Sequence, residues 1–419
     1  MRSFRRALTA IAATMLVATA AGARVEASPQ RTASAAAPPA TASADRAQLV
    51  LADGRRIDVL RVLPSGDRRA VEWRRPDGDR DESAAFGEVV AILWIDRAPI
   101  GEARPSIAMQ NGERFPGRLD RAEGTLRWMH PWLGAISIDL ERTRSISIEG
   151  SASSETSDPT AEADRVRLAN GDRIEGLVTE LDREVAIESL ADGSVRRVPL
   201  EVVARLDFLE SRQAPGAIRF EARDGTVVDV ASFRTSPPSL REATRRGEAA
   251  TIDLVRSGDQ PGSSRPSITL PLEDFAALLL APARIELLAS MVPTVEAIDG
   301  SERLWLPSPR SADSTAPIAS RDVEISGPVR VRYRVAKGSV LSAIATLPDT
   351  MRRFGDFEMR VLDGSREVLR HRFSREDPSI AIAAPIDTGE LVIELREGLH
   401  GPVQDRLLLE SPMLIAPRP

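Results

Sequence analysis

Hydrophobic and polar residues alternate along four related stretches of the chain, and each alternation ends in an Asp-Gly or Asn-Gly pair. The four stretches are QLVLADGRR (48–56), SIAMQNGER (106–114), RVRLANGDR (165–173) and IRFEARDGT (218–226). Asp-Gly and Asn-Gly favour the type I′ turn of a two-residue hairpin, because both central positions need positive φ. The pattern therefore predicts four copies of one antiparallel β-hairpin.

The four hairpins recur at a nearly constant period. Their turn glycines are Gly54, Gly112, Gly171 and Gly225, spaced 58, 59 and 54 residues apart. Both asparagines of the protein, Asn111 and Asn170, occupy one position of the repeat. After each turn we expect a second alternating strand and a second hairpin. A unit this small has a marginal core of its own, so neighbouring units should pack on one another or close into tight barrels.

The repeat period sets the expected domain boundaries. We expect β repeats over 48–100, 104–150, 164–212 and 216–283. The fourth is expected to be degenerate, with an insertion from about 232 to 265 that holds a short helix over Ser239–Arg246. Residues 28–46 and 151–163 are rich in Ala, Ser, Pro and Thr or in polar residues, which is typical of flexible linkers.

Residues 284–419 lose the period but keep a high density of alternating strands and polar turns, which predicts a β-sandwich of jelly-roll type. The expected strands are Arg303–Leu306, Asp322–Ile325, Val329–Val335, Val340–Leu347, Phe357–Leu362, Glu367–Phe373, Ser379–Ala383, Glu390–Leu395 and Arg406–Ile415. The chain as a whole is therefore predicted to be all-β, with tandem small antiparallel barrel repeats followed by a C-terminal sandwich.

The first 27 residues have the layout of a secretory signal peptide. Arg2, Arg5 and Arg6 precede an apolar run from Ala7 to Gly22, and small-residue cleavage sites follow. The alternative is an uncleaved anchor, but the alanine-rich run is shorter than the ~20 apolar residues of a membrane span. We expect export to the periplasm or the outside, with no membrane span after cleavage.

Charge and rare residues exclude several classes of function. The formal net charge is −6. Cleavage after residue 27 would remove four Arg and one Glu, so the net charge of the remaining chain would be more negative. Nucleic-acid binding needs clustered positive charge, so no nucleic-acid partner is expected. Cysteine is absent, and His130, His371 and His400 are far apart in sequence. We therefore expect no metal site and no cofactor.

No catalytic motif is present: the chain lacks a G-x-S-x-G elbow, H-E-x-x-H, a P-loop and G-x-G-x-x-G. We expect a non-catalytic protein, with a carboxylate-based hydrolase as the remaining enzymatic alternative. A glutamate recurs near the last strand of each repeat, at Glu88, Glu141, Glu201 and Glu273. Such a recurring position is more typical of a solvated turn than of a site.

Aromatic side chains are the remaining candidates for ligand contact. Trp128 and Trp132 flank the expected tip of a hairpin in the second repeat. Exposed rings there would stack on a sugar, whereas buried rings would pack against the neighbouring unit. We name Trp128 and Trp132 as candidate ligand-binding residues and keep packing as the alternative.

Two resemblances to known families follow from these patterns. Over about residues 48–280, the Gly-Asp turn, bent second strand and short last strand resemble the Sm-like small-barrel family. Over about residues 300–415, the chain resembles the NPCBM family of carbohydrate-binding modules. The carrying segments are VRVRYRV (329–335), SVLSAIATLP (339–348), RRFGDFEMRVLDGSREVLRHRF (352–373), ELVIELREG (390–398) and DRLLLESPMLI (405–415).

The second resemblance implies a galactose-binding-like sandwich and glycan contact. The family's Gly-x-Phe-x-x-x-Val strand is met by Gly355, Phe357 and Val361. Its late Asp-Trp is replaced by Gln404-Asp405-Arg406, and its acidic loop reads PDTMRR (348–353), so no binding residue is carried over. The leading hypothesis is an exported module that binds a glycan or a cell-envelope protein. The alternatives are a purely structural or protein-interaction scaffold and, behind it, the hydrolase.

Overall fold

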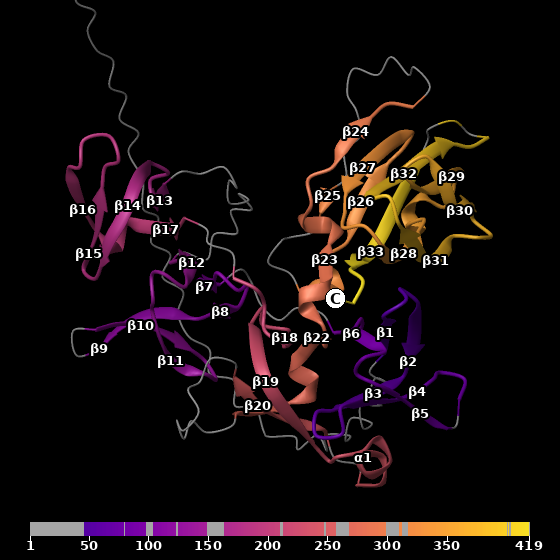
Figure 1. Cartoon of the computed structure of the whole chain (residues 1–419), viewed down its shortest axis with the longest axis horizontal. Coiled ribbons are helices and arrows are strands. Elements are labelled where there is room, and N and C mark those ends of the chain that lie inside the picture. The colour runs from indigo at the N-terminus through magenta and orange to yellow at the C-terminus, as the bar shows by residue number, and fades with distance from the viewer. Residues whose placement is uncertain are drawn as a thin grey trace, which may run out of the picture. The chain divides into compact units, whose positions relative to one another are not determined.

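The computed structural model describes most of the chain from Arg46 onward. The described residues are 46–78, 80–97, 104–122, 125–148, 163–209, 213–246, 249–256, 268–298, 310–311, 317–399, 401 and 404–418 (Figure 1). The predicted signal peptide, nearly all of both predicted linkers and the predicted strand Arg303–Leu306 lie outside them. Within the described ranges, no helix combines the length and apolar character needed to cross a membrane.

The described chain is built almost entirely of antiparallel strands, which confirms the all-β prediction. Residues 47–279 form four segments with one recurring strand order. The first segment contains β1 (Ala47–Leu51), β2 (Arg56–Val59), β3 (Arg61–Ser65), β4 (Ala70–Arg74), β5 (Asp81–Ala85) and β6 (Val89–Trp94). The second contains β7 (Ser106–Met109), β8 (Arg114–Pro116), β9 (Arg118–Ala122), β10 (Thr125–His130), β11 (Gly134–Ser137) and β12 (Thr143–Ser147).

The third and fourth segments repeat this order with an unbroken second strand. The third contains β13 (Asp164–Leu168), β14 (Arg173–Leu181), β15 (Glu184–Glu188), β16 (Val195–Pro199) and β17 (Val203–Asp207). The fourth contains β18 (Ile218–Ala222), β19 (Val227–Ser236), β20 (Thr251–Arg256), β21 (Ile268–Pro271) and β22 (Phe275–Leu279). The helix α1 (Leu240–Arg246) lies between β19 and β20, so the insertion enlarges a connection and leaves the strand order intact.

Each segment opens with the predicted hairpin, but the predicted type I′ turn is wrong. Only the glycine of each Asp-Gly or Asn-Gly pair has positive φ, and its N–H donates to the carbonyl three residues earlier, so the glycine is the last residue of the turn and not its second central one. The glycines of the four turns have φ between 86° and 91°, a region in which residues with a Cβ are strained. The residue before each glycine stabilises the turn through its side chain. Its oxygen accepts the backbone N–H two residues on, in Asp53–Arg55, Asn111–Glu113, Asn170–Asp172 and Asp224–Thr226. This Asx hydrogen bond explains why only Asp or Asn occupies the position.

The segments are joined through their last strands. The last strand of the first segment pairs with that of the fourth, β6 with β22, and β12 of the second pairs with β17 of the third. A bridge between β8 and β19 links the two pairs of segments into one sheet path. Strands β6 and β22 are buried on both faces, in keeping with their uninterrupted apolar runs VVAILW and FAALL. Closure of each segment into an Sm-like barrel stays a prediction.

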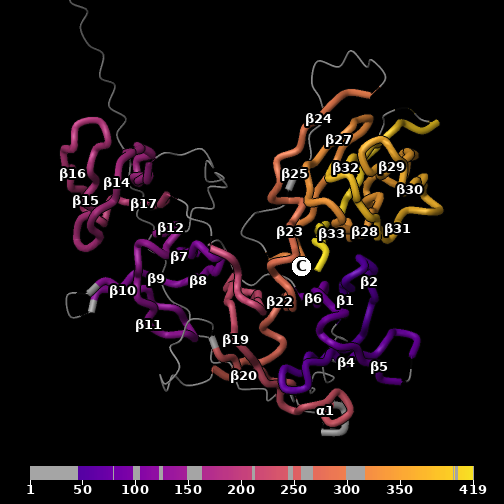
Figure 2. The backbone as a smooth tube through the Cα atoms, in the orientation of Figure 1, coloured from indigo at the N-terminus to yellow at the C-terminus, as the bar shows by residue number. Residues whose placement is uncertain are grey.

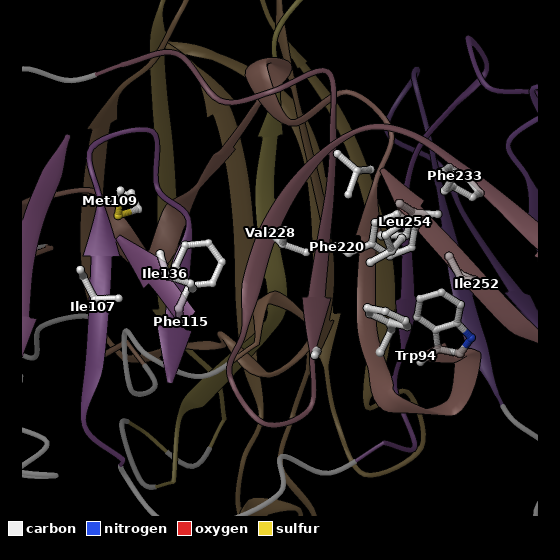
Figure 3. Close-up of a cluster of buried hydrophobic side chains, with 14 of the residues drawn as sticks. Trp94, Ile107, Met109, Phe115, Ile136, Phe220, Val228, Phe233, Ile252 and Leu254 are labelled. Atoms are coloured by element: carbon white, nitrogen blue, oxygen red, sulfur yellow. The ribbon is translucent and has the colours of Figure 1, made fainter. Parts of the chain in front are cut away.

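Figure 3 shows how the apolar side chains of these segments gather. Ile107, Met109, Phe115 and Ile136 of the second segment form one group, and Trp94 lies with Phe220, Phe233, Ile252 and Leu254 in another. Trp94, Phe115 and Phe220 are at most 1% exposed. Each group draws on the inward residues of alternating strands, as binary patterning requires.

The C-terminal part is a two-sheet sandwich (Figures 1 and 2). One sheet contains β23 (Ile285–Leu287), β25 (Arg310–Ser311), β26 (Val323–Ser326), β33 (Arg406–Ile415), β28 (Ser339–Thr346) and β31 (Ser379–Ile386). The other contains β24 (Thr294–Glu296), β27 (Val329–Arg334), β32 (Glu390–Glu397), β29 (Phe357–Asp363) and β30 (Arg366–Phe373). The eight predicted strands that fall within the described residues are confirmed to within a few residues at their ends.

The sandwich packs directly on the first and fourth segments. Val50, Leu93 and Leu279 of those segments form a buried cluster with Met413 and Ile415 of β33. Gly54 approaches so closely that a Cβ there would lie 2.5 Å from Val340 Cγ1. The repeats and the sandwich therefore share a buried interface.

A half-buried arginine holds the same contact through polar bonds. Arg56 donates to the Ser342 carbonyl at 3.1 Å and to the Ser411 carbonyl at 2.7 Å. Burial lowers the pKa of Arg56 to about 10, against the opposing effect of Glu410, Asp322 and Asp58, so it stays protonated at neutral pH. A second polar link runs from the backbone N–H of Ile318 to the buried Glu221 of the fourth segment, at 2.6 Å.

Candidate functional site

A recess lies at one end of the sandwich, and we call it the loop-end pocket. Its volume is about 390 Å³ and it opens to solvent. It is lined by Arg352, Arg353, Phe354, Gly355, Asp356, Arg372, Ser374, Arg375 and Glu376. These residues come from the loop between β28 and β29 and from the end of β30 with the turn that follows it.

The first loop is anchored by apolar residues at both ends, which forces its middle to the surface. Leu347 and Phe357 are fully buried, and the 3₁₀ turn Asp349–Met351 (η6) lies between them. The intervening residues are mainly polar. As a result Phe354 emerges with 40% of its surface exposed, although phenylalanine is normally a core residue. Its backbone N–H donates to Gln404 Oε1 at 3.2 Å, which ties the loop to the start of β33.

Two glycines allow the loops to approach this closely. A Cβ on Gly355 would lie 2.7 Å from Leu347 Cδ1 and 2.8 Å from the Met351 carbonyl oxygen. A Cβ on Gly398 would overlap the backbone carbonyl of Asp356. Neither glycine has positive φ, so close approach and not turn geometry requires them.

The polar groups of the pocket are held in fixed orientations. Asp356 is nearly buried and accepts two parallel hydrogen bonds from Arg372, both 2.9 Å long, and a third from the Leu399 N–H at 3.2 Å. The hydrogen bond to Asp356 raises the pKa of Arg372 above its ordinary value. Such a bidentate pair fixes the guanidinium plane and leaves its outer edge available to a ligand, since the Arg372 side chain is 56% exposed.

The rim of the pocket combines apolar and cationic surface. The Arg353 guanidinium lies over the Phe354 ring at 5.0 Å from the ring centre, and 40% of the Phe354 surface is exposed. In the turn after β30, Ser374 Oγ accepts the N–H groups of Glu376 and Asp377 and donates to Glu376 Oε2. An exposed ring flanked by planar hydrogen-bonding groups can hold a ligand that has both a C–H face and hydroxyl groups.

The sequence-predicted aromatics lie elsewhere, in the second segment. Trp128 is fully buried, and its Nε1 would clash with a Cβ on Gly117. Trp132 is partly buried and donates from Nε1 to Asp224 Oδ2 at 3.3 Å, in the turn of the fourth segment. Trp128 is therefore a core residue, Trp132 contacts the fourth segment, and a role of either ring in binding stays a prediction.

His130 shares this joint between the second and fourth segments. Its Nδ1 accepts the N–H groups of Trp132 and Leu133, so the proton lies on Nε2, which is 2.9 Å from Thr226 Oγ1. All its ring nitrogens are thus used in packing. Among the described residues, no group of three or more His, Cys, Asp or Glu side chains is placed to hold a metal ion.

The recurring glutamates are all exposed: Glu88, Glu141, Glu201 and Glu273 lie at the surface near the last strand of each segment, where a solvated turn position was expected.

The pocket itself has only Asp356 and Glu376 as acidic lining residues. Asp356 is bound on both oxygens, an arrangement suited to orientation and poorly suited to proton transfer.

The sequence does not predict the loop-end pocket. Its residues come from two separate places in the chain, around Phe354 and around Arg372. One signal was present: a lone phenylalanine between Arg353 and Gly355, in a loop where no alternation requires an apolar residue.

Gly398→Ala is expected to destabilise the sandwich by about 2 kcal/mol, because the added methyl would overlap backbone that cannot move as a flexible side chain does. Gly78→Ala is the matched control, since a Cβ there would meet no atom closer than 3.5 Å and the glycine does not have positive φ. Urea unfolding followed by circular dichroism measures both. Equal stability of the two variants would contradict the close packing of Gly398 on Asp356.

Comparison with known proteins gives likeness in structure alone. No protein-family model matches the chain, and no curated protein matches its sequence. The CBM51 module of a GH95 protein from Clostridium perfringens, solved in complex with methyl-galactose, is 9% identical; 31% of this chain and 99% of that chain are covered, with a TM-score of 0.25. The tandem CBM51 modules of Sp3GH98, a family 98 glycoside hydrolase from Streptococcus pneumoniae, are 10% identical over 72% of this chain and 88% of that chain, also with a TM-score of 0.25.

A third structure contains CBM51-2 in complex with GlcNAc and the INT domains of Clostridium perfringens ZmpB. It is 8% identical, with 54% of this chain and 44% of that chain covered and a TM-score of 0.27. This chain thus spans less than half of that chain's length. Structural likenesses at these TM-scores assign neither a ligand nor a residue role to this chain. A functional assignment therefore rests on the residues of the loop-end pocket.

Proposed function

We propose that the protein is an exported, non-catalytic glycan-binding protein whose loop-end pocket receives the sugar. The observation that carries this proposal is the exposed Phe354 ring beside the fixed Asp356–Arg372 pair. A pyranose presents an apolar C–H face and equatorial hydroxyl groups. The ring would stack on the first while the ion pair hydrogen-bonds the second.

The architecture supports a binding role in a second way. Asp356, Gly355 and Gly398 are locked by close packing, so little ordering of the protein would accompany binding. The first and fourth segments, which contact β28 and β33 through Arg56 and Val50, would hold the sandwich in a fixed orientation.

Phe354→Ala is expected to weaken glycan binding about tenfold, corresponding to ~1.4 kcal/mol for loss of a stacked ring. The measurement is a glycan array on the full chain, followed by calorimetry on the best glycan. Val292→Ala is the control, because Val292 is 94% exposed in the same sandwich and does not line the pocket. Failure to bind any glycan, or equal binding by Phe354→Ala, would refute the proposal.

A protein-interaction scaffold is the second candidate, and one surface of the third segment favours it. Leu177 and Val195 are about half exposed and both lie opposite Glu188 in the β14–β15–β16 sheet; Leu190 is 65% exposed. Strand β16 ends the sheet path, so its outer edge is unpaired within the described chain. Cross-linking of the full chain in envelope extract, with cross-links confined to this segment, would favour the scaffold over the glycan-binding protein.

A further inference from the structure

The loop-end pocket carries more positive than negative charge, in a protein whose formal net charge is −6. Its acidic lining residues are Asp356 and Glu376, against Arg352, Arg353, Arg372 and Arg375. Two of the arginines have acidic partners: Arg352 pairs with Asp349 at 2.6 Å and Arg372 with Asp356. The charges of Arg352 and Arg372 are therefore compensated within the protein.

Arg353 and Arg375 remain. Both are exposed, and within the described chain neither forms an ion pair or a hydrogen bond. The Arg353 guanidinium is positioned by the Phe354 ring, over which it lies. Arg375 follows Ser374, whose hydroxyl accepts the backbone N–H of Glu376 in the same turn. By contrast, two half-buried arginines of β27 are paired across the sheet, Arg330 with Glu394 and Arg332 with Glu390.

Uncompensated guanidinium groups beside a stacking ring select for negative charge. A guanidinium is weakly hydrated, and its planar fork matches the two oxygens of a carboxylate or sulfate. Arg353 keeps its outer donors while its face lies on Phe354, so a ligand ring that stacks on this pair would bring an acidic substituent within reach. Glu376 opposes this attraction, and the Ser374 hydroxyl, which donates to Glu376 Oε2, orients that carboxylate without cancelling its charge.

We propose that the ligand of the loop-end pocket is an anionic glycan, whose carboxylate or sulfate group is bound by Arg353 and Arg375 while its sugar ring lies against Phe354. This inference rests on the proposed glycan-binding function and names the class of glycan. Neutral sugars would occupy the same site without the charge-assisted bonds and therefore more weakly.

Calorimetry on the full chain tests the inference with three oligosaccharides of equal length: neutral oligogalactose, oligogalacturonate and sulfated oligogalactose. We expect at least one of the two anionic forms to bind tenfold or more tightly than the neutral one at 50 mM NaCl. The preference should shrink at 300 mM NaCl, because salt screens exposed charges. The two anionic arms tell carboxylate from sulfate.

Arg353→Gln and Arg375→Gln should each reduce anionic binding several-fold and leave neutral binding unchanged. Arg334→Gln is the matched control, since Arg334 is exposed on the same sandwich and does not line the pocket. Equal affinity for neutral and anionic forms, or a preference that survives both substitutions, overturns the inference while glycan binding stands. Absence of binding to every sugar overturns both the inference and the proposed function.

Discussion

Replacing Asn111 by Asp is expected to lower the free energy of unfolding by about 3 kcal/mol, a cost typical of leaving a buried charge uncompensated. The Asn111 amide donates to Glu113 Oε2 at 3.0 Å and to Asp229 Oδ2 at 3.2 Å. Glu113 and Asp229 are 4% and 1% exposed, and Arg219 bonds Asp229 at 2.7 Å. A carboxylate at position 111 removes both donors and sets a third negative charge beside two buried ones.

The chain contains its own control for this substitution. Asn170 occupies the same position of the repeat, with the same hydrogen bond from its side-chain oxygen to the N–H two residues on. Within the part of the chain that the structure describes, its amide donates only to the exposed Asp172, at 2.8 Å, so Asn170→Asp should cost no more than about 0.5 kcal/mol. Asp already occupies this position at Asp53 and Asp224, so the turn itself accepts the change.

Urea unfolding of both variants at pH 7 and at pH 4 measures the difference. The deficit of Asn111→Asp should narrow at the lower pH, because protonation removes the added charge. Equal losses of unfolding free energy in the two variants would mean that Asn111 stabilises its turn and not the contact between the second and fourth segments.

Replacing Arg56 by Met is the second large expected effect, again a loss of about 3 kcal/mol. The substitution keeps the apolar stem but removes the donors to the Ser342 and Ser411 carbonyls, which lie in the contact between the first segment and the sandwich. It also removes the positive charge near Asp322. Burial already raises the pKa of Asp322, against the opposing effect of Ser411 and Arg56.

Arg55→Met, one residue away, is the control. The Arg55 side chain is 69% exposed and its partner Asp53 is 54% exposed, so their ion pair should contribute less than about 0.5 kcal/mol. Unfolding by urea, followed by tryptophan fluorescence and circular dichroism, should give Arg56→Met a lower midpoint. Because protonated Asp322 needs no counter-ion, the deficit should narrow as pH falls. Equal midpoints for the two variants would show that Arg56 does not stabilise the contact.

The strand positions could be predicted because their causes are local. The Asp-Gly and Asn-Gly pairs set four turns through positive φ at Gly54, Gly112, Gly171 and Gly225 and through the Asx hydrogen bond before each of them. Alternation placed the sandwich strands in the same way: Val329, Val331 and Tyr333 of β27 face inward, and the arginines between them face outward. Both signals act over a few residues and need no knowledge of distant parts of the chain.

The candidate site could not be predicted in this way. An isolated Phe354 in a polar loop gives no sign of the partners that surround it, and Arg372 lies on a strand where alternation accounts for it as a solvent-facing residue. Trp128 and Trp132 flank a turn, a pattern that predicts exposed rings only if nothing covers the turn. Whether such rings face solvent depends on what covers the turn, and here the fourth segment covers it through Asp224 and Thr226.

The sequence by itself determined the all-β class, the four related hairpins, the strands of the sandwich and the solvated position of the recurring glutamates. The tertiary structure decided which last strands pair, β6 with β22 and β12 with β17, and it decided that the sandwich packs on the first and fourth segments. It also brought Phe354, Asp356 and Arg372 to one end of the sandwich. The reason is physical: a period of two establishes that a strand has two faces, but only long-range shape complementarity determines what covers each face.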